Sequence, residues 1–185
     1  MSKRQYLVAG NWKMNGSQAS NRSLVEGIVA GAGDCPEVEI LVCPPSVYLY
    51  PVAAQLGGGV RLGAQNLADQ GKPGAYTGEI HGAMLREAGC DYVLVGHSER
   101  RALYGESDAV VAAKFGVAQT LDLVPVLCLG ESLAERDAGQ TEAVLARQLD
   151  AVIDHSGVGA FSRAVIAYEP VWACGTGRTA SGAQA

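Results

Sequence analysis

Six short apolar runs, separated by longer stretches of helical character, most constrain how this chain of 185 residues can fold. Most of the runs are nearly continuous in apolar residues rather than alternating apolar with polar. That pattern is typical of strands buried on both faces, and it predicts a parallel sheet covered by helices, an α/β fold. The runs are residues 6–12, 38–43, 60–64, 92–96, 124–129 and 164–168.

The segments between the runs predict helices. Residues 17–32 carry apolar side chains at helical spacing, and residues 101–121 and 132–153 are rich in Ala, Leu and Val. Ser132 is predicted to cap the last of these, with Glu135 completing a capping box. Because the β-α order repeats six times without a break in composition, we expect a single domain over residues 1–185.

Composition excludes several classes of function. The chain carries 14 basic and 19 acidic residues and has no basic run of the kind that follows nucleic acid phosphates. It has no apolar stretch near the roughly 18 residues of a membrane span. The cysteines show no Cys-x-x-Cys pattern, so they predict neither a zinc site nor a disulfide framework, and they favour a reducing, cytoplasmic location. They are Cys35, Cys43, Cys90, Cys128 and Cys174.

Six β-α units fit either an open doubly wound sheet or a (β/α)8 barrel. The first run is not followed by the Gly-x-Gly-x-x-Gly of a dinucleotide-binding fold. Polar side chains stand at the ends of several runs instead, which is where a barrel builds its active site. These side chains are Asn11, Lys13, His97, Glu99 and Glu169.

Asn11 lies near the end of the first run, and Lys13 follows it directly. The two residues alternate and are expected to share one side of an extended segment. A lysine in this place is most often a solvated loop residue. A cation at a strand end can also hold a substrate anion or stabilise an oxyanion.

His97 follows the fourth run, with Ser98 and Glu99 beside it. Ser98 is expected to cap the next helix, and Arg101 to lie in its first turn. An imidazole near a helix N-terminus has its neutral form favoured, and a neutral imidazole can donate a hydrogen bond to a carbonyl. His81 and His155 lack such company and are interpreted as surface or helix residues.

Glu169 is the strongest candidate for chemistry. It stands directly after the sixth run. Pro170 follows it, and then a glycine-rich segment that contains Gly175 and Gly177. A strand-end carboxylate is often just the partner of an arginine. Under a dry, mobile loop it becomes a better base, because burial disfavours its charged form. Gly175 also offers an N–H group for a phosphate.

The sequence resembles the triosephosphate isomerase family in four motifs that occur in the family's order and spacing. They are residues 11–15 (Asn-Trp-Lys-Met-Asn), 96–101 (Gly-His-Ser-Glu-Arg-Arg), 128–131 (Cys-Leu-Gly-Glu) and 168–172 (Tyr-Glu-Pro-Val-Trp). The resemblance implies the TIM (β/α)8 barrel and isomerisation of a small phosphorylated triose, dihydroxyacetone phosphate to glyceraldehyde 3-phosphate, without cofactor or metal.

The resemblance also assigns roles. Glu169 would be the base, His97 the neutral electrophile and Lys13 the cation that faces the substrate, a pairing of glutamate and histidine known for the family. Asn11 and Gly175 would bind substrate with Lys13. The supporting positions would be Glu99, Cys128, Glu131 and Trp172. Trp172 would lie at the hinge of the lid, and Glu131 would contact it.

Residues 65–79 resemble the family's long third loop, with Thr77 as the residue that reaches into a neighbouring subunit. The segment is long and shows no periodic pattern of apolar residues. This favours a loop with a function over a solvent-exposed loop without one. A homodimer or a higher self-assembly is implied, with no nucleic acid and no membrane as partners.

Two departures from the family pattern stand out. Cys174 replaces the family's usual isoleucine over the base, which predicts a less dry site and some loss of rate. Only about six of the eight β-α units are present, without the family's seventh and eighth strands and their phosphate-binding N–H groups. The first and sixth strands are then expected to expose apolar edges.

Two other functions compete with the isomerase. The first is a catalytically inactive barrel fragment that acts as a structural or self-assembling module. The second is a barrel enzyme that uses Lys13 as a Schiff-base nucleophile, although a lysine within a buried strand would suit that chemistry better.

Overall fold

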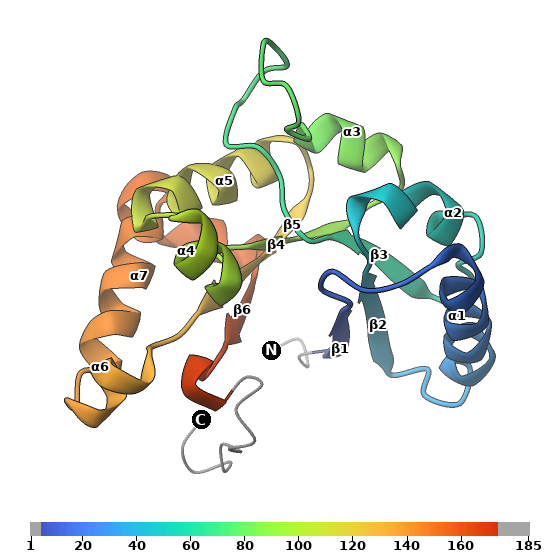
Figure 1. Ribbon diagram of the computed structural model, residues 1–185, viewed down its shortest axis with the longest axis horizontal. Coiled ribbons are helices and arrows are strands. Elements are labelled where there is room, and N and C mark those ends of the chain that lie inside the picture. The colour runs from blue at the N-terminus through green and yellow to red at the C-terminus, as the bar shows by residue number, and fades with distance from the viewer. Residues whose placement is uncertain (1–4, 174–185) are drawn as a thin grey trace. The chain divides into compact units, whose positions relative to one another are not determined.

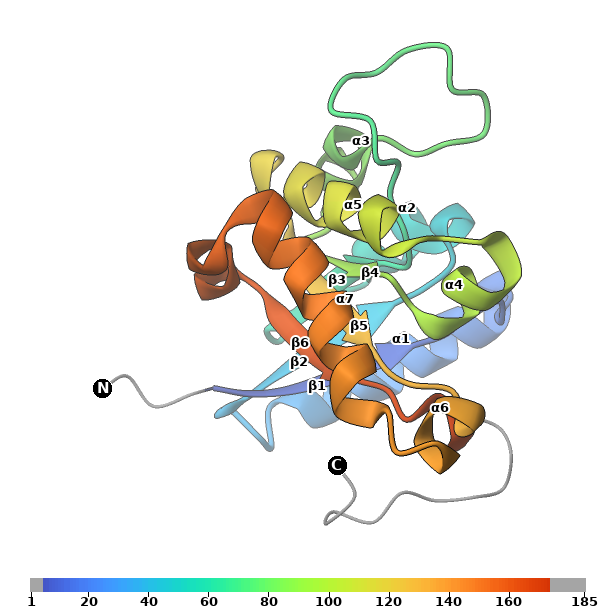
Figure 2. The same cartoon turned by 90° about the vertical axis from the view of Figure 1, so that its left-hand side faces the viewer.

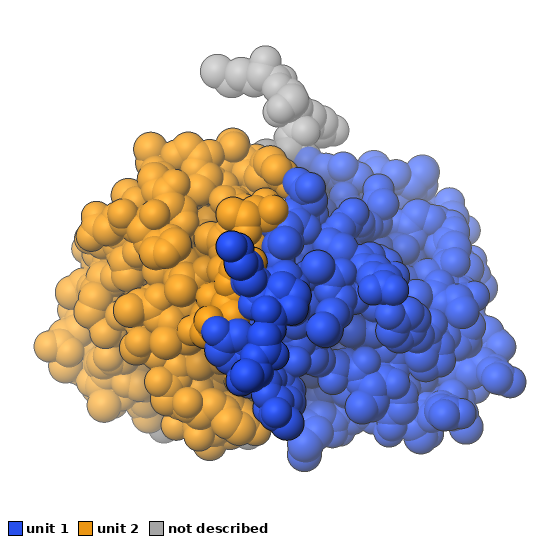
Figure 3. All heavy atoms as spheres, turned by 90° about the horizontal axis from the view of Figure 1, so that it is seen from above, with its two compact units in different colours: residues 1–68, 72–93, 121–123 blue, residues 69–71, 94–120, 124–185 orange. Residues whose placement is uncertain are grey.

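The computed structural model describes residues 5–173 of the chain. These residues fall into two compact units, drawn in blue and orange in Figure 3. Within the described residues, the first unit takes in residues 5–68, 72–93 and 121–123, and the second takes in residues 69–71, 94–120 and 124–173. The single domain expected over residues 1–185 stays a prediction.

The first unit alternates strands with helices (Figure 1). The helix predicted over residues 17–32 is present as α1 (Gln18–Ala32). Ser17 caps it as one half of a capping box with Ser20. The elements are β1 (Tyr6–Asn11), α1 (Gln18–Ala32), β2 (Val38–Cys43), η1 (Ser46–Tyr48), α2 (Leu49–Ala53), β3 (Val60–Ala64), α3 (Gly82–Glu87) and the start of β4 (Tyr92–Val95).

The strands of this unit are parallel and pair in sequence order. β1 pairs with β2 from Tyr6 opposite Val38 to Asn11 opposite Cys43, and β2 pairs with β3 from Ile40 opposite Val60. β3 pairs with β4 through Gly63 opposite Tyr92. This register brings the end of β1 beside the end of β2, so the loops that follow the two strands leave the sheet at one edge.

The second unit also alternates strands with helices. Its elements are the end of β4, α4 (Ser98–Tyr104), α5 (Asp108–Thr120), β5 (Val124–Leu129), α6 (Leu133–Asp137), α7 (Thr141–Ser156), η2 (Val158–Arg163), β6 (Val165–Tyr168) and η3 (Val171–Ala173). β5 and β6 are parallel, with Val126 opposite Val165 and Leu129 opposite Tyr168. α5 and α7 pack side by side (Figure 2). Phe115 of α5 is fully buried, and its ring lies 5.4 Å from that of Phe161 in η2.

The parallel α/β architecture is confirmed, and within residues 5–173 a strand lies at each of the six apolar runs. Three of them, β2, β3 and β5, have the predicted bounds. β5 is buried along nearly its whole length, as a strand covered on both faces must be. β1 differs, because Tyr6 and Val8 are 65% and 60% exposed. In β6, Ile166 is 52% exposed. Apolar side chains are thus exposed on both strands, as expected.

The prediction was wrong for two helices. Residues 101–121 form not one helix but α4 and α5, which are separated at Gly105, and residues 132–153 form α6 and α7, separated at Gly139. Both glycines have left-handed backbone, with φ of 67° and 69°. A left-handed residue ends a helix, and glycine adopts that conformation without a Cβ clash. The capping box of Ser132 and Glu135 is present, at the start of α6.

The short helices α2 and α3 were not predicted from the sequence.

Among the residues that the structure describes, no helix is both long and apolar enough to cross a membrane.

Candidate functional site

His97 of the second unit stands between β4 and α4 and caps the helix itself. Its Nδ1 accepts a hydrogen bond from the Glu99 N–H at 3.2 Å. The expectation that Ser98 caps this helix was therefore wrong, since Ser98 is the first helical residue. The histidine precedes the helix by one residue, so its ring nitrogen reaches the free N–H groups of the first turn.

This cap decides where the imidazole proton lies. Because Nδ1 accepts a hydrogen bond, it carries no hydrogen, and the neutral ring must hold its proton on Nε2. The Nε2 atom of His97 lies 3.2 Å from Oε1 of Glu169. The ring therefore presents a single N–H donor, and that donor is directed at a carboxylate.

Glu169 follows β6, and both its backbone and its side chain are held. Its N–H donates to the Leu129 carbonyl at 2.7 Å, which continues the ladder between β5 and β6 by one residue. Its Oε2 accepts from the Ser98 N–H at 3.2 Å. The side chain is only 17% exposed. Glu169 and His97, which are far apart in the sequence, are thus brought together as predicted.

Two other predicted positions lie next to this pair. Cys128 is buried in β5, and burial, together with the charge of Glu169, raises the pKa of its thiol to about 12. The thiol is therefore protonated at neutral pH and is no nucleophile. Glu99 is half exposed, and its Oε2 lies 3.8 Å from Nδ1 of His97.

Glu131 has no exposed surface and collects several donors. Its carboxylate accepts hydrogen bonds from Trp172 Nε1 and Tyr168 Oη at 3.1 Å and from Arg136 Nη1 at 3.0 Å. Burial raises the pKa of Glu131, but its own backbone N–H and these donors outweigh burial and hold the pKa below its ordinary value. The predicted contact between Glu131 and Trp172 is present.

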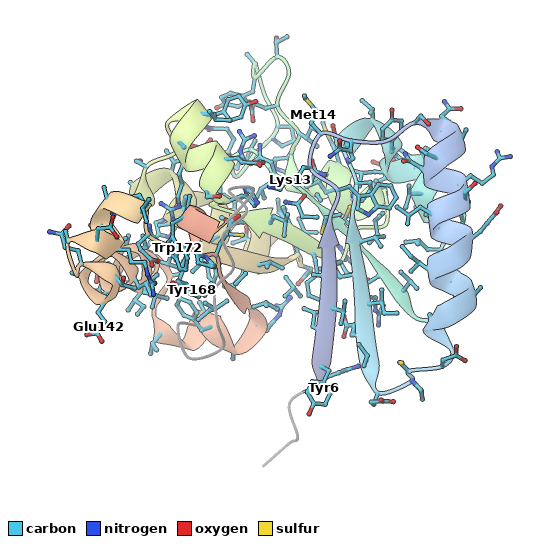
Figure 4. The ribbon with its side chains drawn as sticks, turned by 60° about the horizontal axis from the view of Figure 1, so that its bottom comes forward. Tyr6, Lys13, Met14, Glu142, Tyr168 and Trp172 are labelled. Atoms are coloured by element: carbon cyan, nitrogen blue, oxygen red, sulfur yellow. The ribbon has the colours of Figure 1, made fainter. Side chains whose placement is uncertain are left out.

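Arg136 also contacts the tryptophan directly. Its guanidinium lies 4.4 Å from the centre of the Trp172 ring, a cation–π contact. Tyr168 and Trp172 lie near each other in Figure 4, on either side of Glu169 in the sequence. The segment that carries Glu169 is therefore anchored on both sides of that residue to one buried carboxylate.

In the first unit, Asn11 and Lys13 do not share an extended segment, and that expectation was wrong. β1 ends at Asn11, and Lys13 has left-handed backbone with φ of 52°. The Lys13 N–H donates to Asn11 Oδ1 at 2.9 Å, and the Lys13 carbonyl accepts from Gln65 Nε2 at 2.8 Å. Gln65 also donates to the Cys43 carbonyl, so it joins the loops after β1 and β2.

This conformation at Lys13 is strained for a residue with a Cβ. Such strain costs of order 1–3 kcal/mol and persists where the surroundings impose it. Here the surroundings are the two hydrogen bonds of its backbone. Figure 4 shows Lys13 and Met14 on the loop that follows β1.

The remaining predicted residues are placed as follows. Thr77 is exposed on the long loop between β3 and α3, which is drawn in green in Figure 2. His155 is exposed on α7, as expected for a surface or helix residue. His81 is not at the surface, since it is only 7% exposed, but it does belong to a helix end, as the N-cap of α3. Cys174, Gly175 and Gly177 lie outside the described residues.

Sequence reasoning missed Gln65, Arg136 and Gln148. Gln148 of α7 binds both the N–H and the carbonyl of Gly130, the residue that follows β5. Only this glutamine left a signal in the sequence. It stands four residues from each of two buried valines, Val144 and Val152, so it interrupts an apolar helix face with an amide.

We compared the sequence with protein families and with known proteins. The family model of triosephosphate isomerase matches residues 6–185. The chain is 57% identical to a triosephosphate isomerase of Dechloromonas aromatica over 183 residues, which are 98% of this chain and 73% of that protein. It is 56% identical to one of Halorhodospira halophila over 182 residues, which cover 98% and 72% of the two chains.

A triosephosphate isomerase of Hydrogenovibrio crunogenus is 52% identical over 183 residues, again 98% of this chain and 72% of the relative. The match thus extends over nearly all of the sequence rather than one motif. The chain belongs to the triosephosphate isomerase family.

Proposed function

We propose that the chain interconverts dihydroxyacetone phosphate and D-glyceraldehyde 3-phosphate by proton transfer through an enediolate. The observation that carries the proposal is the contact of 3.2 Å between the Glu169 carboxylate and Nε2 of His97, the ring nitrogen left to carry a proton by the cap at Nδ1. A base and a neutral hydrogen-bond donor are the two groups needed to move a proton between the carbons that flank a carbonyl.

In this reaction Glu169 removes a proton from the carbon beside the carbonyl, and the Nε2–H of His97 donates to the carbonyl oxygen as negative charge develops there. The carboxylate then returns the proton to the neighbouring carbon. The hydroxyl proton moves between the two oxygens through His97, whose Nε2 gives its proton to the former carbonyl oxygen and takes one from the hydroxyl that becomes the new carbonyl. The substrate oxygen would take the place of Glu169 Oε1 as the acceptor of the Nε2–H. The Ser98 N–H remains available to hold the other carboxylate oxygen.

Lys13, Asn11 and Gly175 complete the proposed substrate site. The left-handed backbone at Lys13 supports a functional role, since strained residues cluster at active sites. The ammonium group would face the phosphate and the enediolate oxygens, and Asn11 would orient the lysine through its hydrogen bond to the Lys13 N–H. Reduction by borohydride in the presence of substrate separates this role from a Schiff base, because only the latter leaves an adduct on Lys13.

The experiment that tests the proposal is isomerisation by the purified chain, produced in a host without isomerase activity of its own. His97→Gln is expected to lower kcat by about 10²-fold or more, because the donor to the carbonyl oxygen is lost. His155→Gln is the matched control, since this histidine is exposed on α7. Turnover is measured by NMR in D2O, where isomerisation also introduces deuterium.

A folded chain without turnover would contradict the proposal and favour the alternative, an inactive structural or self-assembling module. Exposed apolar side chains on β1, Tyr6 and Val8, are the observation that supports that alternative. Equal turnover in the His97→Gln and His155→Gln chains would contradict the assigned chemistry.

We further propose that the chain forms a homodimer or a higher self-assembly through the loops of its first unit. Large apolar side chains are exposed on loops after β1, β2 and β3, where Met14, Val47 and Tyr76 are 94%, 77% and 46% exposed. Tyr48 Oη donates to the Gly16 carbonyl at 3.2 Å and joins the first two loops. Exposed apolar surface of this kind is typical of an interface, and Thr77 lies beside Tyr76.

Met14→Asp is expected to raise the dissociation constant of the self-assembly by about tenfold or more, because a charge would be buried in the contact. Sedimentation velocity over a range of concentrations measures it. Val158→Asp, at a side chain that is 73% exposed in the second unit, is the control and should leave the assembly unchanged. A chain that is monomeric at all concentrations would contradict the proposal.

A cytoplasmic location stays a prediction. It is supported by the free thiols of Cys35, Cys43, Cys90 and Cys128.

A further inference from the structure

Gln148 makes an unusual pair of hydrogen bonds inside the second unit. It is 5% exposed on α7, its Oε1 accepts from the Gly130 N–H at 3.0 Å, and its Nε2 donates to the Gly130 carbonyl at 3.1 Å. These complementary partners fix the orientation of the amide. A side chain from a helix thus supplies both hydrogen bonds that a neighbouring strand would otherwise give to Gly130.

Gly130 in turn lies against the backbone of Glu169. A Cβ built on Gly130 would overlap the Glu169 carbonyl oxygen and would lie 3.4 Å from Cγ2 of Val171. The preceding residue, Leu129, accepts the Glu169 N–H through its carbonyl at 2.7 Å. Only glycine leaves room for this approach, so the place of the Gly130 backbone limits where the Glu169 backbone can lie.

We infer that Gln148 is a positioning residue for Glu169. By holding both polar groups of Gly130, it fixes the backbone against which Glu169 packs, and so fixes the carboxylate 3.2 Å from His97 Nε2. Gln148 belongs to the cavity of about 430 Å³ that is also lined by Gly130, Cys128 and Glu169. The inference rests on the proposed function, in which Glu169 is the base.

The reason for a kinetic effect is geometric. A displacement of about 1 Å in a reacting group can cost 10²-fold in rate, because proton transfer needs a near-attack arrangement. Gln148 touches neither the carboxylate nor the imidazole in the contacts described, so its effect must pass through the backbone. A residue of this kind changes kcat and leaves the binding of substrate nearly unchanged.

The test compares Gln148→Met, which keeps the length of the side chain and removes its polar atoms, with Val152→Ala. Val152 is fully buried one turn further along α7, so its truncation weakens the same helix face without touching Gly130. The main measurement is the amide ¹H–¹⁵N signals of Gly130 and Glu169 and the carboxyl ¹³C signal of Glu169. We expect all three to move in Gln148→Met and to stay in Val152→Ala.

Steady-state kinetics form the second measurement. Gln148→Met is expected to lower kcat by about 10- to 100-fold with KM within about threefold of the parent value. Gln148→Asn, which keeps the amide but withdraws it by one methylene, serves if the methionine variant does not fold, and it should shift the same signals.

The outcomes separate the two claims. If the Glu169 signals of the Gln148 variants stay where they are in the parent, Gln148 only satisfies Gly130 and the inference is overturned, whatever the kinetics show. If those signals move while the parent chain has no turnover, the proposed function fails and the positioning of Glu169 by Gln148 stands.

Discussion

Replacing Glu169 by glutamine is expected to lower kcat for triose phosphate isomerisation by a factor of about 10² to 10⁴, the range typical of general acid–base catalysis. The amide keeps the size of the side chain and its contact distance to His97, but it cannot accept a proton from carbon. KM should change little, because this carboxylate holds the proton in transit rather than the phosphate. Steady-state kinetics in both directions measure the loss.

Glu169→Asp tests whether the position of the carboxylate, and not only its presence, is needed for catalysis. The carboxylate remains, but it is withdrawn by one methylene from Nε2 of His97 and from the Ser98 N–H, both now at 3.2 Å. A loss of about 10²-fold is expected from displacement alone. Glu142→Gln, at an exposed residue of α7, is the control for loss of a carboxylate. A Glu169→Gln chain that kept more than a tenth of the parent kcat would exclude Glu169 as the base.

The second large effect concerns stability and centres on Glu106. Its side chain is 6% exposed, and its Oε1 accepts from Lys114 Nζ at 2.5 Å and from Arg100 Nε at 2.6 Å. The Lys114 side chain is also only 6% exposed. Glu106→Leu leaves a buried ammonium group without this carboxylate, and removing one partner of a buried ion pair costs about 3–5 kcal/mol of unfolding free energy.

A double variant tests the cause of that loss. Glu106→Leu combined with Lys114→Met replaces the pair by apolar side chains of similar size, and such replacements are often neutral. The double variant should therefore recover most of the stability that Glu106→Leu loses, as measured by urea unfolding. A double variant as unstable as the single one would show that packing around Glu106, and not its charge, is what matters.

The effect of Glu106 also depends on pH. Burial raises the pKa of Glu106, but hydrogen bonds from Lys114 and Arg100 outweigh it, so the pKa lies below the ordinary value of 4.5. A carboxyl group with a lowered pKa in the folded state stabilises the fold above its unfolded pKa and loses this contribution as pH falls through its folded pKa. The difference in unfolding free energy between parent and Glu106→Leu should therefore be full at pH 7 and shrink below about pH 4.5.

The sequence alone located the strands and most of the polar residues at their ends. β2, β3 and β5 have the predicted bounds, because a run of buried apolar residues between turn residues is a local signal. His97 and Glu169 were found for the same reason, as polar residues directly after such runs. Four motifs in register then indicated the family, which the comparisons confirm.

What the tertiary structure decided are the contacts between residues that are distant in sequence. No local pattern shows that Gln65 holds the Lys13 carbonyl, 52 residues away, or that Gln148 holds both polar groups of Gly130. Local patterns also misplaced the helix cap at His97 and joined helices that Gly105 and Gly139 separate. Helices and strands follow from the periodic burial of side chains, and that period can be recognised in the order of apolar and polar residues along the sequence. The positions of Lys13 and Glu169 depend instead on backbone groups that must find hydrogen-bond partners wherever the packed fold supplies them.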